Sequence, residues 1–278
     1  MDVEIINNKY KILNKIGEGS FGTVYKAQHT RTNDYVAVKK EIYDIKYKLL
    51  KHETNIYNHL KNCDIVPKLR WFGKIALTNC LVMDLLGKSL QSVIKSHHKF
   101  SLKIVLQVAI TILKILKNIH SKGIVHRDIK PDNFLFGLND ESKKLYIIDF
   151  GLSKHYINNG THIEFSTTDN LIGSLTYTSI NSHNFTELSR RDDLESLSYM
   201  LVYFYFGNLS WQSIKDVKNG QSVNKQIKEL KEQILKTPEM PNVLTQFITS
   251  VKKIGFDEPP KYDLYINYFM THMSKNKL

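Results

Sequence analysis

The stretch HRDIKPDN, residues 126–133, lies between two apolar segments and carries four charges of mixed sign, a histidine and a proline. Neither a helical period nor the alternation of a strand explains this order of side chains. Polar groups at fixed intervals in a short loop are typical of a functional site that a rigid scaffold holds in place. The rest of the chain therefore has to supply the scaffold and the partners of this loop.

The length and composition predict a globular protein with a substantial core. The chain has 278 residues, and 42% of them are apolar, which suffices for one large domain or two lobes. Residues 197–206 form the densest apolar run, which is too short to span a bilayer and predicts a buried helix. Residues 1–14 carry no targeting signal, and Cys63 and Cys80 form no zinc or disulfide pattern. We therefore expect no membrane contact and a location in the cytoplasm or nucleus.

A net charge of +12 would suit nucleic acid, an acidic membrane or acidic protein partners. The lysines, however, are scattered at helical spacing and mixed with glutamates, as in residues 224–236, which is typical of solvated helix faces. No arginine stripe with interleaved aromatic residues is present, so the sequence gives little support to nucleic-acid binding.

Short segments rich in tyrosine, valine and isoleucine predict a small antiparallel sheet in the first part of the chain. One helix, residues 45–60, is expected among these strands because apolar residues recur there at helical spacing. The expected strands are residues 10–17, 22–29, 35–41, 68–72 and 76–86.

Helices are expected to dominate from Ser101 onward, where apolar residues recur every three or four positions as far as Gly123. Ser101 is a good N-cap and Gly123 a good stop signal. The sequence thus predicts an α+β fold with a β-rich lobe, residues 1–86, and a mostly helical lobe, residues 87–278, in a single domain. Besides the helix after Ser101, the expected elements are a strand at 144–148 and helices at 191–206, 223–236, 241–254 and 262–274.

The segment GEGSFGTV, residues 17–24, places glycines in the pattern GxGxxGxV between two expected strands. Glycine permits close approach of the backbone to an anion, although glycine-rich hairpins are also ordinary turns. A helix follows the glycines in the dinucleotide-binding motif, whereas a strand is expected here. This context favours a loop that covers nucleotide phosphates.

The strand segment VAVK, residues 36–39, sends Ala37 and Lys39 to the same face. Glu53 follows fourteen residues later in the expected helix, where it can pair with Lys39 and hold the ammonium against phosphates. Taken alone, each residue could equally be an ordinary surface charge. Their order within the series of motifs favours the ion pair.

The side chains of the HRDIKPDN loop suit phosphoryl transfer. Asp128 can accept a hydroxyl proton, Lys130 can neutralise charge on a transferring phosphoryl group, and Asn133 can hold a metal ion. Asp149, in the segment DFG at the end of an apolar strand, supplies a second oxygen ligand that suits Mg²⁺. Four such motifs in this order are very improbable by chance.

These motifs resemble the eukaryotic protein kinases over nearly the whole chain, from about Tyr10 to about Met273. The segment after DFG lacks the usual APE motif and reads TYTSINSHNFTELSRRDDLESLSYMLVYF, residues 176–204. With LLGKSL, IIDFGLSK and LSWQSIK, it is similar to the casein kinase I family. The resemblance implies the two-lobed protein-kinase fold and transfer of the γ-phosphoryl group of Mg²⁺-bound ATP to serine or threonine of acidic or primed proteins.

The resemblance also implies roles at individual positions of the nucleotide site. Lys39 and Glu53 become the ion pair, Met83 the gatekeeper behind adenine, and the backbone of Asp84 and Leu86 the partner of the adenine edge. The other nucleotide-binding positions are Ile16, Gly17, Glu18, Gly19, Ser20, Gly22, Val24, Ala37 and Leu135. The apolar members of this set could equally be plain core residues.

In the loop itself, the resemblance makes Asp128 and Lys130 catalytic and Asn133 and Asp149 ligands of magnesium. Asp193 is similar to a buried aspartate that braces the catalytic loop in the family. The alternative for Asp193 is charge compensation at a helix N-terminus.

The sequence departs from the family where a phosphorylated substrate residue would be recognised. The family has an arginine at the position of Thr176 and a lysine at that of Asp169, and an aspartate would repel a phosphate. Arg127 and Lys154 remain as a second candidate anion site, unless Arg127 only positions the loop, and Lys218 or Lys225 could replace a further cation. We therefore expect weaker dependence on primed substrates.

Regulation is expected to be simple. Relatives are active without activating phosphorylation, and none of Ser166, Thr167, Thr168 and Ser174 can be singled out as a phosphorylation site. The chain ends at Leu278, which leaves no room for the inhibitory tail of many relatives. A monomer is expected.

Three other functions remain open from the sequence. A pseudokinase scaffold would bind partners without transferring phosphate, but every catalytic position carries the expected side chain. Nucleic-acid binding could coexist with kinase activity. The vaccinia-related and tau-tubulin kinases are related groups that the intact HRDIKPDN and SIN elements disfavour.

Overall fold

The computed structural model describes residues 4–19, 22–42, 49–214 and 220–277. The chain packs into two compact units, of which the first comprises Met1–Ser89 and Phe134–Leu152 and the second Leu90–Asn133 and Ser153–Leu278. The sequence had assigned all of residues 87–278 to one lobe, whereas Phe134–Leu152 groups with the first unit. Backbone hydrogen bonds explain the difference, because Phe136 pairs with Gly87 and Lys88, and Ile147 donates to Ile65.

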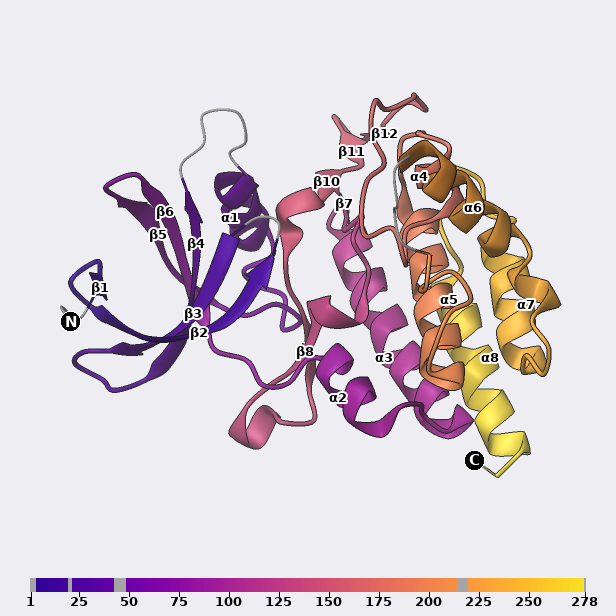
Figure 1. Ribbon diagram of the computed structural model, residues 1–278, viewed down its shortest axis with the longest axis horizontal. Coiled ribbons are helices and arrows are strands. Elements are labelled where there is room, and N and C mark those ends of the chain that lie inside the picture. Colours follow the sequence, from indigo (N-terminus) through magenta and orange to yellow (C-terminus); the bar gives the residue numbers. More distant parts are fainter. Residues whose placement is uncertain (1–3, 20–21, 43–48, 215–219, 278) are drawn as a thin grey trace. The chain divides into compact units, whose positions relative to one another are not determined.

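A six-stranded antiparallel sheet forms the body of the first unit, with the strand order β1-β2-β3-β4-β6-β5 (Figure 1). The strands lie close to where the alternation of tyrosine, valine and isoleucine predicts them. Their bounds are β1 Ile5–Ile6, β2 Tyr10–Gly19, β3 Gly22–His29, β4 Tyr35–Ile42, β5 Leu69–Ile75 and β6 Thr78–Asp84.

One helix, α1 (Leu49–His59), packs against β5 and β6 and against the 3₁₀ turn η3 (Phe150–Leu152). Its buried face includes Leu50, Ile56 and Tyr57, and also the charged side chain of Glu53. The expected helix began at residue 45, but residues 43–48 lie outside the described part of the chain. The hairpin of β8 (Phe134–Phe136) and β9 (Leu145–Ile147) completes this unit.

The second unit is mostly helical. Helix α3 (Leu102–Ser121) packs against α5 (Arg190–Phe206) and α8 (Tyr262–Lys275), and α5 also packs against α7 (Asn242–Val251). Thirteen of the α5 residues are buried, including residues 197–204 of the apolar run that predicted a buried helix. The other helices are α2 (Leu90–His97), α4 (Ile180–His183), α6 (Gly220–Glu232) and the 3₁₀ turns η1 (Pro131–Asn133), η2 (Asn139–Glu141, which belongs to the first unit) and η4 (Ile234–Lys236).

The helix signals at both ends of α3 act as the sequence predicts. The Ser101 hydroxyl accepts a hydrogen bond from the backbone N–H of Ile104, and Gly123 has a φ of +76°. Two helices were missed: α2 is a short helix, and α4 is a single turn within the segment that follows DFG. The remaining short strands are β7 (Ile124–Val125), β10 (Lys154–His155), β11 (Ile157–Asn158) and β12 (Thr161–His162).

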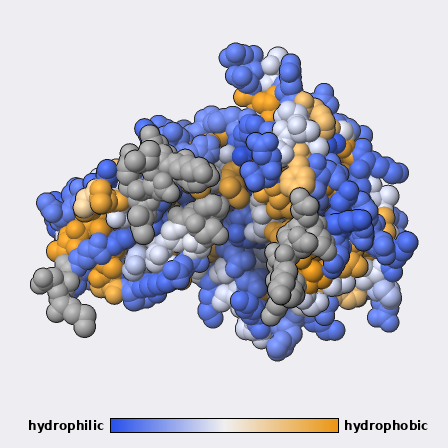
Figure 2. All heavy atoms as spheres, turned by 45° about the horizontal axis from the view of Figure 1, so that its top comes forward, coloured by the Kyte–Doolittle hydropathy of each residue, from blue (hydrophilic) through white to orange (hydrophobic). Residues whose placement is uncertain are grey.

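The surface agrees with the interpretation of the net charge as solvated helix faces. On the face drawn in Figure 2, hydrophilic residues predominate and the hydrophobic areas among them are small. Within the described residues, no helix combines the length and apolar character that crossing a membrane requires. Cys63 and Cys80 are both buried and form no disulfide.

Candidate active site

A buried cluster of three charges lies within the first unit. The Lys39 ammonium, on β4, lies 2.7 Å from Glu53 Oε2 on α1 and 2.9 Å from Asp149 Oδ1, just before η3. Lys39 and Glu53 are 8% and 1% exposed, so this is not a surface ion pair. Tyr57 on α1 accepts a hydrogen bond from the Asp149 backbone N–H at 3.2 Å and thereby fixes the position of Asp149. The structure thus brings together three residues that the sequence placed in three separate motifs.

The electrostatics of this cluster keep Lys39 charged. Burial by itself would lower the pKa of the Lys39 ammonium, but the charges of Glu53 and Asp149 and the hydrogen bonds to them outweigh burial and raise the pKa above its usual value. Burial raises the pKa of the Glu53 carboxyl to about 7 while Lys39 counteracts burial, and with Glu53 ionised the cluster holds one positive and two negative charges. A divalent cation or a ligand that brings one would compensate the excess negative charge.

The glycine-rich hairpin joins β2 to β3 in the same unit. Val24 pairs with Gly17 on one side and with Lys39 on the other, so the hairpin lies one strand away from the lysine. Gly22 has a φ of +137°, and a Cβ atom there would lie 2.2 Å from the carbonyl oxygen of Lys40. Only glycine fits this position. Ser20, predicted to contact nucleotide, lies outside the described residues, while Glu18 is exposed and pairs with Lys15.

The apolar residues predicted to sandwich adenine lie on strands of two sheets of the first unit. Ala37 on β4 is paired directly with Met83 on β6, and both are 8% exposed. Leu135 lies on β8 and is half-buried, whereas Ile16 is 47% exposed on β2. An apolar side chain left half exposed at a sheet edge is what a ligand ring would cover.

The backbone predicted to meet the adenine edge follows β6. The Asp84 side chain accepts hydrogen bonds from Arg70 and from the backbone of Lys68, so it serves the sheet rather than a ligand. Leu86 lies in an irregular extended segment, and within the described part of the chain its backbone N–H has no hydrogen-bond partner. This N–H remains available to a ligand.

The HRDIKPDN loop of the second unit is held together by its own polar side chains. The Asp128 carboxylate is 5% exposed and accepts hydrogen bonds from Lys130 Nζ at 2.6 Å and from Asn133 Nδ2 at 3.3 Å. Its other oxygen accepts from the Ser174 backbone at 2.9 Å and from the Ser174 hydroxyl at 2.7 Å. Lys130 also donates to the Ser174 hydroxyl at 3.2 Å. A carboxylate that already accepts from a serine hydroxyl, beside an ammonium, is equipped to accept the proton of a substrate hydroxyl.

The backbone of both motifs is strained. Arg127 and Asp149 each have a φ of +66°, which is unusual for residues other than glycine. Such strain is kept only where the surroundings determine the conformation, and it occurs preferentially at functional sites.

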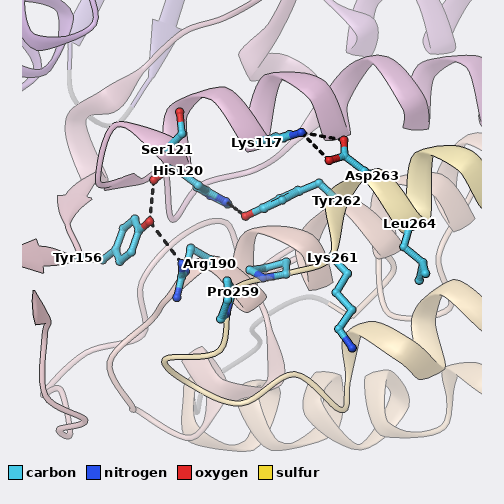
Figure 3. A pocket seen from close by; sticks show the side chains of 11 residues that line it. Lys117, His120, Ser121, Tyr156, Arg190, Pro259, Lys261, Tyr262, Asp263 and Leu264 are labelled. Atoms are coloured by element: carbon cyan, nitrogen blue, oxygen red, sulfur yellow. Dashed lines mark hydrogen bonds and ion pairs between the residues drawn. The ribbon is translucent and has the colours of Figure 1, made fainter.

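Asp193 at the start of α5 braces the HRDIKPDN loop, as the resemblance implied. Its two carboxylate oxygens accept the backbone N–H groups of His126 and Arg127, each at 2.8 Å. His120 on α3 donates from Nε2 to the same carboxylate at 2.8 Å, while its Nδ1 accepts from the Tyr262 hydroxyl, and Figure 3 shows the two rings end to end. Burial would raise the pKa of Asp193, but the hydrogen bonds that its carboxylate accepts from the His120 side chain and the His126 backbone outweigh burial and lower the pKa.

His120 therefore stays neutral beside an ionised Asp193, since burial lowers the pKa of the imidazole. No pattern in the sequence pointed to His120 or Tyr262, because they lie far apart in the chain and each is an ordinary residue of an expected helix. Ser174 was considered only among candidate phosphorylation sites. Its contact with Asp128 spans 46 residues and could not be read from local spacing.

The second candidate anion site is already occupied by a carboxylate of the chain. Arg127 lies 3.2 Å from Glu187 Oε1, and Lys154 lies 2.7 Å from Glu187 Oε2. Glu187 is 5% exposed, so it is a permanent partner rather than a surface contact. This geometry favours the alternative in which Arg127 positions the loop.

The oxygen donors fit a divalent metal. Asp149 contributes a carboxylate whose side chain is 24% exposed. The amide nitrogen of Asn133 donates to the Asp128 carbonyl at 2.8 Å, and among the described residues the amide oxygen has no hydrogen-bond partner. Asp149 belongs to the first unit and Asn133 to the second, and within the described residues no three His, Cys, Asp or Glu side chains cluster around a metal position. Mg²⁺ does not need such a cluster, because substrate phosphates and water complete its coordination.

Comparison with known families agrees with this chemistry. A family model described as the protein kinase domain matches residues 10–260, which includes the charged cluster of the first unit and the HRDIKPDN loop of the second. Members use ATP and divalent metal ions to phosphorylate proteins. The chain belongs to the protein kinase family.

Proposed function

We propose that the protein is a serine/threonine kinase of the casein kinase I type, with Asp128 as catalytic base. The observation that carries the proposal is the contact of Asp128 with both the Ser174 hydroxyl and Lys130. This arrangement supports transfer to a hydroxyl on a short side chain. The SIN and SRRDDLES segments support the casein kinase I type.

The proposed mechanism assigns each step to residues of the chain. Asp128 accepts the proton as the substrate oxygen attacks the γ-phosphorus, and Lys130 offsets the charge on the transferring group. Lys39 holds the phosphates of ATP, and Glu53 holds Lys39. Bound Mg²⁺, held by Asp149 and Asn133, would neutralise phosphate charge. Positioning and electrostatics then account for catalysis without a covalent enzyme intermediate.

The substrate preference we propose is for acidic proteins, with priming recognition weakened. Thr176 contributes no charge, and its carbonyl is engaged by the Trp211 indole N–H at 2.8 Å. Asp169 is exposed and negative. Arg127 and Lys154 share the carboxylate of Glu187, which offsets one of their two positive charges. Lys218 lies outside the described residues, and Lys225 on α6 is exposed.

A peptide series tests both parts of this proposal. Matched peptides with serine, threonine or tyrosine as acceptor, each with a phosphoserine, aspartate or alanine three residues upstream, are compared by kcat/KM. We expect transfer to serine and threonine with only a small advantage of phosphoserine. Transfer to tyrosine alone, or a large advantage of the phosphorylated peptides, would contradict the proposal.

A gain-of-function variant sharpens the priming test. Asp169→Lys combined with Thr176→Arg restores the two missing cations, and we expect the ratio of primed to unprimed kcat/KM to rise about tenfold, the effect of one added charge-assisted hydrogen bond. Lys225→Met in the unaltered protein serves as the companion variant. If the ratio of primed to unprimed kcat/KM falls in Lys225→Met, Lys225 already replaces one of the cations of the family.

We also propose a monomer located in the cytoplasm or nucleus. The two buried, unpaired cysteines are compatible with a reducing compartment. Size-exclusion chromatography with light scattering tests the oligomeric state.

A further inference from the structure

A second buried lysine lies in the helical unit, outside the quoted motifs but in contact with the segment that follows DFG. Lys231 on α6 is 0% exposed. Its ammonium donates to the backbone carbonyl of Leu175 at 2.9 Å and to that of Thr178 at 2.7 Å, and it lies 3.0 Å from His183 Nε2. Within the described residues no carboxylate lies at ion-pair distance from it.

The imidazole of His183 is set up to accept from Lys231. Its Nδ1 pairs with Asn224 Oδ1, and Asn224 Nδ2 donates to the His183 carbonyl at 3.2 Å. An amide oxygen can only accept, so Nδ1 carries the hydrogen and Nε2 is left with a lone pair. Burial and the nearby Lys231 charge lower the pKa of His183 to about 4, which keeps the ring neutral. All three N–H groups of the ammonium therefore have an acceptor.

Two aromatic rings complete the surroundings of the ammonium. Its nitrogen lies 5.0 Å from the ring centre of Tyr199 and 5.7 Å from that of Trp211. The Trp211 indole N–H donates to the carbonyl of Thr176, which lies between the two carbonyls that Lys231 binds. Three carbonyls in a run of four residues are thus held by side chains from outside the segment.

The segment held in this way begins at the residue that contacts Asp128. The backbone N–H groups of Tyr177 and Thr178 both donate to the Ser174 carbonyl, at 2.9 and 2.8 Å, and close a turn. The N–H and hydroxyl of Ser174 donate to Asp128 at the other side of this turn. A shift of the carbonyls of Leu175 and Thr178 would therefore move Ser174 against the proposed catalytic base.

We infer that Lys231 is a positioning residue for catalysis: it fixes the turn at residues 174–178, and through Ser174 it fixes Asp128 and Lys130 for the incoming protein substrate. The inference rests on the proposed kinase function. It deepens that function by assigning the order of the substrate-side segment to a buried lysine. It also gives a physical reason for activity without an activating phosphate, since the segment is already held.

The test uses the full chain with Lys231→Met, which keeps the apolar length of the side chain and removes all three donors. Lys228→Met, one turn earlier on α6 and partly exposed, is the matched control. Two readouts are taken: hydrogen exchange of residues 174–183 by mass spectrometry, and steady-state kinetics with peptide and ATP varied separately.

We expect faster exchange confined to residues 174–183, with exchange in α3 and α7 unchanged. The kcat/KM for peptide should fall roughly tenfold to a hundredfold, as a small misplacement of catalytic groups causes. The KM for ATP should stay within about twofold, because the residues assigned to nucleotide lie in the other unit. Lys228→Met should match the unaltered protein in both readouts.

Two results would overturn the inference. One is unchanged exchange at 174–183 in the Lys231→Met protein, and the other is exchange that rises across the whole second unit, which would make Lys231 a packing residue only. If the unaltered protein transfers no phosphate, the proposed function fails, yet the exchange data still decide whether Lys231 orders the turn.

A second variant covers the case in which Lys231→Met does not fold. Trp211→Phe keeps an aromatic ring but removes the N–H that binds the Thr176 carbonyl. We expect the same local increase in exchange and a smaller fall in peptide kcat/KM. No change in either readout would contradict the assignment of this turn as a held element.

Discussion

The two buried lysines, Lys39 in the first unit and Lys231 in the second, are stabilised in opposite ways. Lys39 contacts two carboxylates, which raise the pKa of its ammonium above the usual value against the effect of burial. Lys231 contacts two carbonyl oxygens and an imidazole nitrogen, and burial lowers its pKa to about 7.

The difference indicates which of the two lysines could bind a ligand. Around Lys39 the negative charges outnumber the positive one, and within the described residues the third N–H of the ammonium has no partner. Around Lys231 all three N–H groups are used by neutral acceptors. The first arrangement suits a phosphate with its metal ion, and the second suits a permanent structural contact.

Replacing Lys39 should have the largest effect on activity. In Lys39→Met we expect phosphate transfer to fall about a hundredfold or more, the size of effect seen when one preorganised donor to a developing charge is lost. Lys40→Met is the control, because Lys40 is the next residue of β4 and pairs with Glu4 instead. Steady-state kinetics with peptide substrate measure both. Equal activity of the two variants would remove Lys39 from the phosphate site.

Replacing the partner of Lys39 should have a smaller effect. Glu53→Gln keeps a hydrogen-bond acceptor but removes the charge, and we expect kcat/KM for ATP to fall about tenfold, since a hydrogen bond between charged groups is worth roughly 1.5–3 kcal/mol. Asp149 still holds the ammonium in this variant. A loss as large as that of Lys39→Met would instead mean that Glu53 is needed to keep α1 in place, which a change in circular dichroism would reveal.

The smallest expected effect is the contribution of Lys231 to the pH dependence of the free energy of unfolding. Its folded pKa of about 7 lies below the 10.5 of an ordinary lysine side chain, so between these two pH values the unfolded chain binds a proton that the folded chain lacks. The free energy of unfolding therefore gains a contribution that rises with pH across this window, by about 1 kcal/mol per pH unit. Charged or titratable groups from the packed elements are His183 on α4, Glu195 on α5 and Lys252 after α7.

Because these neighbours remain in Lys231→Met, the difference between the two proteins isolates Lys231. Denaturant unfolding measures this difference. Between pH 7 and pH 9, the free energy of unfolding should rise by roughly 1–2 kcal/mol more in the unaltered protein than in the variant. The neutral amine still donates two hydrogen bonds, so the fold is expected to persist at pH 9. Parallel pH curves for the two proteins would contradict the low pKa and leave Lys231 charged throughout.

Much of the fold could be predicted because its signals are local. Alternation of tyrosine, valine and isoleucine located the strands, and β3 begins and ends where expected, at Gly22 and His29. Caps at Ser101 and Gly123 located α3. The hairpin β8–β9 was assigned to the wrong unit, because its grouping depends on hydrogen bonds to residues 65, 87 and 88 that no local pattern encodes.

Contacts within the candidate site could be predicted where both residues belong to one motif. The contacts of Asp128 with Lys130 and Asn133 span two and five residues. The contacts with Ser174 and of Asp193 with His120 span 46 and 73 residues and depend on helix packing. Lys231 was missed for a further reason: in a helix with mixed lysines and glutamates, nothing in the sequence distinguishes a buried lysine from the exposed ones.

The most direct test of the account is transfer of labelled γ-phosphate from ATP to casein, with and without Mg²⁺, in the unaltered protein, in Asp128→Asn and in Asp132→Asn. Asp132 lies in the same loop, but its side chain is exposed, so it controls for loss of charge in the loop. We predict Mg²⁺-dependent transfer that Asp128→Asn lowers about a hundredfold or more and Asp132→Asn leaves nearly unchanged. No transfer by the unaltered protein, or equal transfer by all three, would contradict the account and favour a scaffold that binds partners without catalysis.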